Sequence, residues 1–565
     1  MTDTLSTALD QHKQDKHEPA EEKYLKLLKQ DPCNIEILHL LAISNGQRGN
    51  LEQAAEYITK ALEQDSSSAY LYNSYANIVK YQGNDNKAQE LYQKSISLEE
   101  NNPASYYNLG LIFIKKNKNK QAISHIEQAI KLKPDYIDAY HVLIKQLHKM
   151  HEIKKASKLI EKTAKIGLTH PIFTKLRAQN QQYQNDIGNA IKNYEQYLCV
   201  NNNDYDAHHH LATAYLIKGD VQTATRHNLA ALEINPEHEE THHNLAVTYL
   251  TQNKLDLALK HWLRALSIAE NIDYLYNIGV VYNYKGHYTD SLSYFEKSLK
   301  LDAKHYNSIV NIAVIYIKKN MPPEARFYFK KALEIKPNDE QNLYMLAALD
   351  GKQDNFKEAP RTYVKDLFDQ YANTFEEHLQ KVLSYKAPEI IYDMLSKYCD
   401  IENKEKLNVC DIGCGTGLMG TKLYEHCASL IGVDLSEKML EQARTKNIYT
   451  DLIHEDINDF LKTKPNSFNL ITAADVIPYY GDITELFGNI KSALATGGYF
   501  IFSVEASVSA DYSLGKNARF THGKEYILAV ADKLNLSIIG TSELSTRKEG
   551  SNEIECNSFI LEKTD

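Results

Sequence analysis

Residues 407–417, L-N-V-C-D-I-G-C-G-T-G, carry the strongest fold signal in the C-terminal part of the chain. Its first half is largely apolar and predicts a buried strand, and its second half is rich in glycine and predicts a tight loop. Glycine adopts backbone conformations that other residues avoid and lets a ligand approach the backbone closely. A strand that enters a glycine loop and then a helix is typical of doubly wound sheets, so we expect an α/β domain here.

The alternation of strands and helices continues to the end of the chain. Further strands are predicted at 429–433, at a segment ending near 454, and at 468–474, 499–504, 536–541 and 557–562. In such sheets ligands bind at the carboxyl ends of the strands. Acidic residues follow three of these strands, namely Asp434, Asp456 and Asp475. The sequence therefore predicts a Rossmann-like domain with a seven-stranded sheet and a ligand site at one edge.

The glycine loop by itself fits two kinds of ligand. Gly415, Gly417 and Gly420 have the spacing of a dinucleotide-binding loop. The surrounding motifs favour another ligand: D-x-G-x-G-x-G at 411–417, D-L-S at 434–436, E-D at 455–456 and A-D at 474–475. Together these motifs resemble the class I S-adenosylmethionine (SAM)-dependent methyltransferases. The resemblance implies a methyltransferase fold with SAM as its cofactor.

The resemblance also implies contacts between single residues and SAM. They are Asp411, Gly413 and Gly415 at the methionine moiety, Asp434 at the ribose with Leu435 beside it, Asp456, Ile457 and Met439 at the adenine, and Asp475 and Tyr371 at the methionine end. Tyr371 belongs to F-D-Q-Y-A-N-T-F, residues 368–375, which is similar to the lid helix before many class I methyltransferase cores.

Small residues recur through the first part of the chain at a fixed interval. They are Ala20, Ala54, Ala88, Ala122, Ala156, Ala190, Ala224 and Ala258, each 34 residues after the last, followed by Ser291 and Ala325. Proline stands twelve residues later in several repeats, where it suits the end of a helix. This period resembles the tetratricopeptide repeat (TPR) family and implies an all-α superhelix of about ten helix-turn-helix repeats.

TPR superhelices have an extended concave groove, which implies a protein or peptide partner. One position on the groove-lining helix carries amide or imidazole side chains, which we call the asparagine ladder: Asn108, His210, Asn244, Asn277 and Asn311. An amide both donates and accepts, so it can bind an extended peptide backbone, as in the similar ladder of the protein O-GlcNAc transferases. The preceding position holds histidine or tyrosine, including Tyr107, Tyr276 and Tyr344. We expect polar contacts there rather than a metal site.

The two parts meet near Pro360, after a polar segment that breaks the repeat. We expect TPR repeats with a capping helix over 1–349, a linker over 350–362, and a methyltransferase domain over 363–565 whose lid helix covers 363–379. A-A-D-V-I-P-Y-Y-G-D-I at 473–483 and A-R-F-T-H at 518–522 look like the catalytic domains of TPR-containing methyltransferases.

Methyl transfer from a sulfonium depends mainly on positioning and desolvation. A base is needed only when the acceptor arrives protonated, as lysine does with a pKa of about 10.4. Asp475, Tyr480 and His522 are the candidate catalytic residues, and Arg519 is a candidate anchor for an acidic group of the substrate. The N-P-P-Y pattern of enzymes that methylate amide or base nitrogens is missing, since 475–480 reads D-V-I-P-Y-Y.

Composition narrows the remaining function classes. The net charge of −10 argues against a nucleic-acid partner. The N-terminus lacks the pattern of a secretory signal, and no long uncharged apolar run predicts a membrane span. Seven scattered cysteines suit a reducing compartment, so we expect a cytoplasmic protein.

Three hypotheses remain after these exclusions. The favoured one is a SAM-dependent methyltransferase whose TPR groove recruits a protein or peptide substrate. The second is a small-molecule methyltransferase whose repeats serve complex assembly. The third is a non-enzymatic TPR scaffold with a vestigial SAM fold.

Overall fold

The structure is a computed structural model that describes residues 2–14, 17–352, 356–372, 375–376, 379, 385–401, 405–507, 509–543, 547–549 and 552–564. The chain divides into two compact units, Met1–Glu270 and Asn271–Asp565. Among the described residues, no helix is long and apolar enough to cross a membrane.

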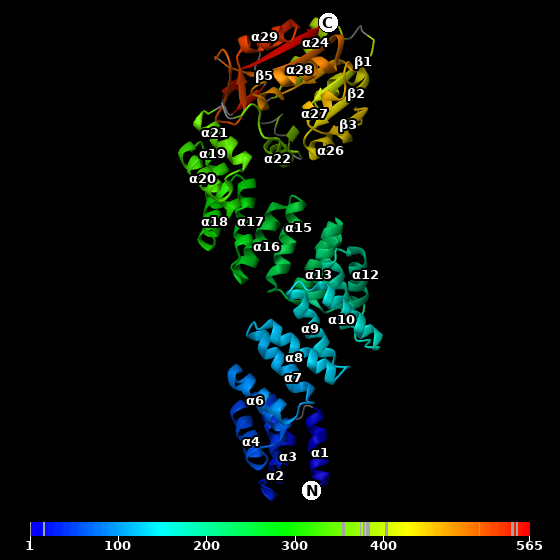
Figure 1. Cartoon of the computed structure of the whole chain (residues 1–565), viewed down its shortest axis with the longest axis vertical. Helices are drawn as coiled ribbons and strands as arrows, with labels where there is room; N and C mark the ends of the chain where they lie inside the picture. Colours follow the sequence, from blue (N-terminus) through cyan, green and yellow to red (C-terminus); the bar gives the residue numbers. More distant parts are fainter. Residues whose placement is uncertain are drawn as a thin grey trace. The chain divides into compact units, whose positions relative to one another are not determined.

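The first unit consists of paired helices (Figure 1). Its elements are α1 (Thr2–Lys13), α2 (His17–Gln30), α3 (Ile35–Gln47), α4 (Leu51–Gln64), α5 (Ala69–Tyr81), α6 (Asp85–Leu98), α7 (Pro103–Lys115), α8 (Asn119–Leu132), α9 (Ile137–Lys149), α10 (Ile153–Lys165), α11 (Ile172–Tyr183), α12 (Ile187–Leu198), α13 (Tyr205–Lys218), α14 (Val221–Ile234), α15 (Glu239–Thr251) and α16 (Leu255–Ile268). The periodic small residues lie on the second helix of each pair and are fully buried, as Ala224 and Ala258 illustrate. Helix pairs pack closely only where such small side chains let the backbones approach.

The second unit begins with the same repeat and ends with an α/β domain. Its helical part comprises α17 (Ile272–Tyr284), α18 (Tyr288–Leu301), α19 (Tyr306–Lys318), α20 (Pro322–Ile335) and α21 (Glu340–Asp350). Counting both units, the described residues form ten helix pairs followed by the single helix α21. This is the arrangement that the 34-residue period predicts.

The α/β domain is built on one twisted sheet with helices around it (Figure 1). Its helices are α22 (Arg361–Tyr371), α24 (Ala387–Cys399), α25 (Gly420–Leu423), α26 (Glu437–Thr445), α27 (Ile457–Lys462), α28 (Thr484–Ala493) and α29 (Lys524–Lys533), with short 3-10 turns η2 (Tyr424–His426) and η3 (Ile477–Tyr479). Its strands are β1 (Leu407–Ile412), β2 (Cys427–Asp434), β3 (Asp451–His454), β4 (Phe468–Ala473), β5 (Leu494–Ala506), β6 (Tyr512–Leu514), β7 (Phe520–His522), β8 (Leu536–Glu543), β9 (Arg547–Glu549), β10 (Asn552–Ile554) and β11 (Cys556–Lys563).

The strand order of the main sheet is β3-β2-β1-β4-β5-β11-β8. The first five of these strands are parallel to one another, and β11 runs antiparallel to both β5 and β8. The strand order reverses between β1 and β4, which leaves a crevice at the carboxyl ends of these two strands. Helical repeats followed by an α/β domain were predicted, and this arrangement is confirmed.

The sheet differs from the predicted one in size. The described strands give a nine-stranded sheet, because β6 and β7 add to the seven strands of the main path. Both are three-residue strands: β6 pairs with β7, and β7 pairs in parallel with the end of β5. Strands this short have too few alternating residues to be recognised by periodicity.

Part of the predicted linker, residues 357–359, packs against the α/β domain. The backbone carbonyl of Lys357 accepts hydrogen bonds from the N–H groups of Gly481 (2.7 Å) and Asp482 (2.9 Å), and the Ala359 N–H donates to the carbonyl of Tyr479 (2.8 Å). Residues 357–359 therefore lie against η3 in strand-like pairing, and Ala359 is buried. This contact leads the chain directly onto the crevice at the carboxyl ends of the strands.

Candidate functional site

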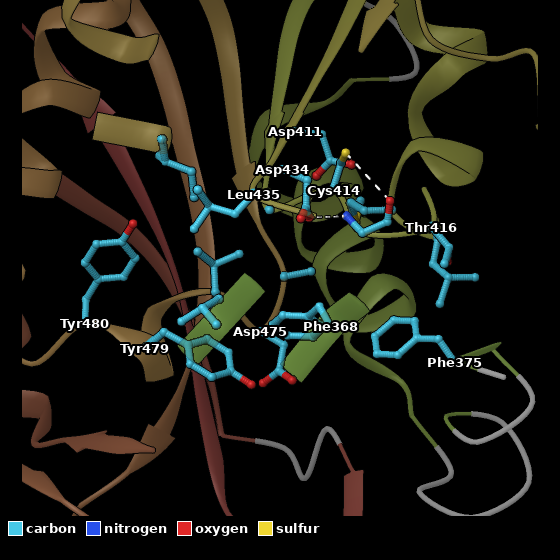
Figure 2. Close-up of a pocket in the computed structure, with 18 of the residues that line it drawn as sticks. Phe368, Phe375, Asp411, Cys414, Thr416, Asp434, Leu435, Asp475, Tyr479 and Tyr480 are labelled. Carbon is cyan, nitrogen blue, oxygen red and sulfur yellow. Dashed lines mark hydrogen bonds between the residues drawn. The ribbon is translucent and has the colours of Figure 1, made fainter. Parts of the chain in front are cut away.

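A cavity lies at the carboxyl ends of β1, β2 and β4 and encloses roughly 1020 Å³, part of it open to solvent. Its described lining comes from the 358–361 segment, α22, the glycine loop and the residues that follow β2, β3 and β4, together with Phe375, Leu379, Tyr385 and Pro388. In Figure 2, Asp411 and Asp434 lie at one side of this cavity and Asp475 and Tyr479 at the other. Acids that the sequence places far apart therefore meet in one site.

The glycine loop forms the floor of the cavity next to β2. Gly413 and Gly415 have φ angles of +63° and +55°, which side chains disfavour. The Gly413 N–H donates to the carbonyl of Val433 (2.7 Å), and the Gly415 N–H donates to Oδ2 of Asp434 (2.8 Å). A Cβ atom on Gly413 would lie 2.4 Å from Cγ2 of Val476, so the loop conformation requires glycine there.

Asp411 is buried beneath this loop. Its carboxylate accepts hydrogen bonds from the hydroxyls of Tyr449 (2.7 Å) and Thr472 (2.8 Å). Burial raises the pKa of Asp411 to about 6, although these two hydrogen bonds oppose the shift. A buried carboxylate held ready in this way favours a cationic ligand group, which would restore its charged form.

Asp434 and Asp456 follow β2 and β3 and line the same cavity. Asp434 accepts from the N–H groups of Gly415 and Ser436 (both 2.8 Å), and burial raises its pKa. Asp456 caps α27 by accepting from the N–H groups of Asn458 and Asp459. Both carboxylates are held by backbone donors, so their positions depend on the fold rather than on flexible partners.

Asp475 follows β4 and has a left-handed backbone, with φ of +61°. Arg519 donates through Nη2 to Oδ1 of Asp475 (2.5 Å), through Nη1 to the hydroxyl of Tyr479 (2.9 Å), and through Nε to Glu505 (2.5 Å). Asp475 and Tyr479 line the cavity, whereas Arg519 is not among its described lining residues. The guanidinium of Arg519 therefore orients Asp475 and Tyr479 without being one of the described lining residues itself.

Helix α22 covers the cavity and is attached to the sheet by polar contacts. Arg361 forms ion pairs with Asp456 (3.0 Å) and Asp459 (2.8 Å). Asp369 accepts from the hydroxyl of Ser436 (2.5 Å), the residue that caps α26. Phe368, also on α22, points into the cavity beside Tyr479 (Figure 2), with ring centroids 5.5 Å apart.

Most of the predicted cofactor contacts border the cavity. They are Asp411, Gly413, Gly415, Asp434, Leu435, Asp456, Ile457 and Asp475. Met439 is fully buried inside the domain and is not among the described lining residues. Tyr371 ends α22, but its side chain lies outside the described residues.

Of the predicted catalytic residues, two line the cavity and one is not among its described lining residues. Asp475 and Tyr480 line the cavity, and burial raises the pKa of Tyr480. His522 is fully buried behind them, with Nε2 3.2 Å from the carbonyl of Gly481, and it is not among the described lining residues. Burial lowers the pKa of His522 to about 4. Arg519, the predicted substrate anchor, forms ion pairs with Asp475 and Glu505 inside the domain.

Several lining residues escaped the sequence prediction. Glu358 and Arg361 lie in the segment read as a linker, and Tyr479 precedes the predicted Tyr480. Tyr449 and Thr472 contribute indirectly, because their hydroxyls donate hydrogen bonds to the carboxylate of Asp411. Only Tyr479 carried a signal in the sequence, as part of the 473–483 motif.

The members of the asparagine ladder are partly exposed residues of first helices. Asn244 donates to the hydroxyl of Thr213 (3.0 Å), whereas Asn277 and Asn311 donate to the helix carbonyls of Asp273 (2.8 Å) and Asn307 (2.9 Å). His210 lies 3.4 Å from Asp206, and Asn108 accepts from Lys80 (3.5 Å). Part of the hydrogen-bonding capacity of each side chain is thus used within the repeats. The described residues contain no cluster of three or more acidic, His or Cys side chains that could hold a metal ion.

The charges around the cavity distinguish between ligand classes. Five carboxylates, those of Glu358, Asp411, Asp434, Asp456 and Asp475, line it, and Arg361 is the one cation among the described lining residues. The helix after the glycine loop, α25, has only four residues. A pyrophosphate needs a helix N-terminus or cations, while a sulfonium and an ammonium group suit carboxylates. The residues present therefore fit SAM better than a dinucleotide.

Comparisons with known proteins agree with both parts of the chain. Residues 409–498 match the methyltransferase domain family, and residues 103–136, 272–305 and 306–339 match tetratricopeptide repeats. An uncharacterized protein of Haemophilus influenzae is 32% identical over 132 residues, which cover 22% of this chain and 50% of that protein. A ubiquinone biosynthesis O-methyltransferase of Hydrogenovibrio crunogenus is 25% identical over 143 residues, covering 24% and 57%.

The chain thus spans about half the length of the curated relatives it matches. Among solved structures, a tetratricopeptide repeat protein from Parabacteroides merdae aligns with a TM-score of 0.37 and 13% identity, covering 46% of this chain and 98% of that one. The family matches and the fold lead to the same assignment: this chain is a TPR-repeat protein that carries a methyltransferase domain.

Proposed function

We propose that this protein is a SAM-dependent methyltransferase of the EC 2.1.1 class that modifies a protein or peptide recruited by its TPR groove. The observation that carries the proposal is the convergence of Asp411, Asp434, Asp456 and Asp475 on one cavity. Each of these residues lies at or just after the carboxyl end of a different parallel strand, at the edge where ligands bind in such sheets.

The residues of the cavity suit the parts of SAM one by one. Asp434 would hold the ribose hydroxyls and Asp456 the adenine amino group, with Leu435 and Ile457 packing on the ring. Asp411 and the Gly413–Gly415 backbone would hold the charged methionine end. When bound, SAM supplies an electrophilic methyl group whose leaving group is neutral.

The chain's own contribution to methyl transfer is positioning and exclusion of water. Phe368, Phe375 and Tyr479 give the cavity an aromatic wall beside Asp475 (Figure 2). Arg519 keeps the Asp475 carboxylate oriented through its hydrogen bond of 2.5 Å. Tyr480 has a raised pKa and stays protonated at neutral pH, so its hydroxyl would donate a hydrogen bond to a ligand rather than act as a base.

Isothermal titration of SAM into the full chain tests the cofactor assignment. We expect micromolar binding, and we expect Asp434→Asn to weaken it at least tenfold, because the ribose loses a charged acceptor. Asp451→Asn is the matched control, since Asp451 begins the neighbouring strand β3 at the opposite edge of the sheet and is exposed. Equal losses in both variants, or no binding to the folded wild type, would contradict the proposal.

The acceptor class needs a second experiment. A SAM carrying a radioactive methyl group, incubated with cell extract and the full chain, should label the protein fraction, and Asn244→Ala/Asn277→Ala/Asn311→Ala should reduce that label while SAM binding stays unchanged. Small-molecule methylation with the repeats used for assembly is the second candidate, favoured by the O-methyltransferase relative. Label confined to the small-molecule fraction would support it.

A further inference from the structure

The last repeat helix carries a tyrosine whose surroundings differ from those of its repeat equivalents. Tyr344 in α21 occupies the position that Tyr107 holds in α7 and Tyr276 holds in α17. Those two side chains are partly exposed, whereas Tyr344 is 0% exposed. It belongs to the hydrophobic core of the α/β domain, together with Tyr479 and Phe520.

The contacts of Tyr344 connect three separate segments of the second unit. Its ring lies 5.3 Å from that of Tyr363 on the lid helix α22 and 6.2 Å from that of Phe520 on β7, measured between centroids. Its hydroxyl donates a hydrogen bond of 2.9 Å to the backbone carbonyl of Ala518. A buried tyrosine hydroxyl needs such a partner, and here the partner belongs to the loop before β7.

Ala518 has an unusual backbone conformation. Its φ is +58°, in the left-handed region, where the Cβ of an alanine crowds the following carbonyl. The turn around it is closed by hydrogen bonds from the Ala518 N–H to the Gly515 carbonyl (2.9 Å) and from the Gly515 N–H to the Arg519 carbonyl (2.8 Å). Strained residues persist only where the surroundings hold them, and the Tyr344 hydroxyl holds the Ala518 carbonyl itself.

The next residue along the chain is Arg519, which orients two residues of the cavity. The guanidinium of Arg519 donates to Asp475 and to Tyr479, and its central carbon, Cζ, lies 5.0 Å from the centre of the Tyr479 ring. The directions of these hydrogen bonds depend on where the Arg519 backbone leaves the turn. A rotation at Ala518 would move the planar guanidinium away from both partners.

We propose that Tyr344 is a positioning residue for the cofactor cavity. Its hydroxyl holds the left-handed turn at Ala518, the turn aims Arg519, and Arg519 orients Asp475 and Tyr479. The helix that ends the repeats is thereby connected to the cavity through successive polar contacts. The effect on SAM rests on the proposed function, whereas the effect on Arg519 does not.

The test uses the full chain and the variant Tyr344→Phe, which keeps the buried ring and removes only the hydroxyl. Two readouts are followed: SAM affinity by titration, and the hydrogen exchange of the Arg519 Nε–H by arginine-selective ¹⁵N NMR. Tyr92→Phe is the matched control, because Tyr92 is equally buried in the first unit and its hydroxyl donates to Asn77 (2.6 Å).

We expect Tyr344→Phe to weaken SAM binding about five- to tenfold, as the loss of one buried hydrogen bond implies, and to speed exchange at Arg519. Tyr92→Phe should change neither. Adding Ala518→Gly should restore most of the affinity, because glycine adopts this φ without strain. A purely structural tyrosine would show no such rescue.

The outcomes separate the two proposals. Unchanged exchange at Arg519 in Tyr344→Phe overturns the positioning role, as does a loss of affinity that Ala518→Gly does not restore. If the wild type binds no SAM, the proposed function fails, and the exchange at Arg519 alone then decides the role of Tyr344.

Discussion

Two glycines of the cofactor loop should respond differently to the same substitution. Gly413→Ala places a Cβ 2.4 Å from Cγ2 of Val476 at a φ of +63°. A left-handed alanine costs about 1–2 kcal/mol, and overpacking a dense core costs about 1–3 kcal/mol. The sum is about 2–5 kcal/mol, which corresponds to a Tm lowered by roughly 4–20 °C in a domain of this size.

Gly415→Ala meets almost no steric obstacle. Its φ is +55°, and the nearest heavy atom to the new Cβ is Cε1 of Phe375, at 3.9 Å. The stability cost is therefore only the backbone part, about 1–2 kcal/mol. The added methyl group, however, projects toward the cavity, so we expect this variant to lose SAM binding while keeping most of its stability.

Scanning calorimetry of the full chain measures the Tm of the α/β domain, and fluorescence of Trp262, the only tryptophan, follows the repeats separately. Gly497→Ala is the control for the backbone cost alone, since Gly497 has φ of +73° and open space around it. Val476→Ala should relieve part of the damage in Gly413→Ala. The reasoning is refuted if Gly413→Ala is no more destabilising than Gly497→Ala.

Three further predictions follow from single contacts. The pKa of Asp411 is raised to about 6, and its charged form binds the cationic cofactor, so SAM affinity should be constant above pH 6 and fall up to tenfold per pH unit below it. In Asp411→Asn, titrations should show a weaker affinity that does not change with pH. If the pH dependence persists in this variant, another group causes it. Asn228 is fully buried, neither of its amide atoms is hydrogen-bonded to a described residue, and other repeats carry residues such as Trp262 at this position. Asn228→Leu should therefore raise the free energy of unfolding of the repeats in urea by about 1–3 kcal/mol. Destabilisation would mean that the amide has a partner. Arg361→Gln removes the half-exposed ion pairs that attach α22 to the sheet. It should weaken SAM binding less than about tenfold, and the loss of affinity should be larger at low salt than at high salt. A loss of affinity that does not depend on salt would contradict the role of these ion pairs.

The helical repeats could be predicted from spacing alone. A residue such as Ala224 is fully buried because helix pairs approach closely at that position in every repeat, and this local requirement recurs every 34 residues or so. Although the contact that requires glycine at position 413 is with the distant Val476, the order of strand, glycine loop and helix is a local pattern of the same kind. Patterns of this kind are readable because the constraint and the residue lie close together in the chain.

The acids of the cavity were also predictable, because the residue after a parallel strand always lies at the same edge of the sheet. Asp434 and Asp456 needed only the correct strand assignment. Motif position did not show that Met439 is fully buried, because a helix residue faces the core or the ligand according to the rotation of its helix. The sequence likewise did not show that His522, at the end of β7, is fully buried.

What the sequence determined by itself was therefore the order of elements, the repeat period and the acids at the strand ends, all of which depend on local periodicity. The tertiary structure alone decided the partners of Arg519, because Asp475 and Glu505 follow or lie on β4 and β5 and become neighbours only when the sheet forms. It also decided that Tyr344, a groove residue by its repeat position, is buried against the α/β domain. Charge pairing and burial depend on which distant segments pack together, and a linear pattern does not encode that packing.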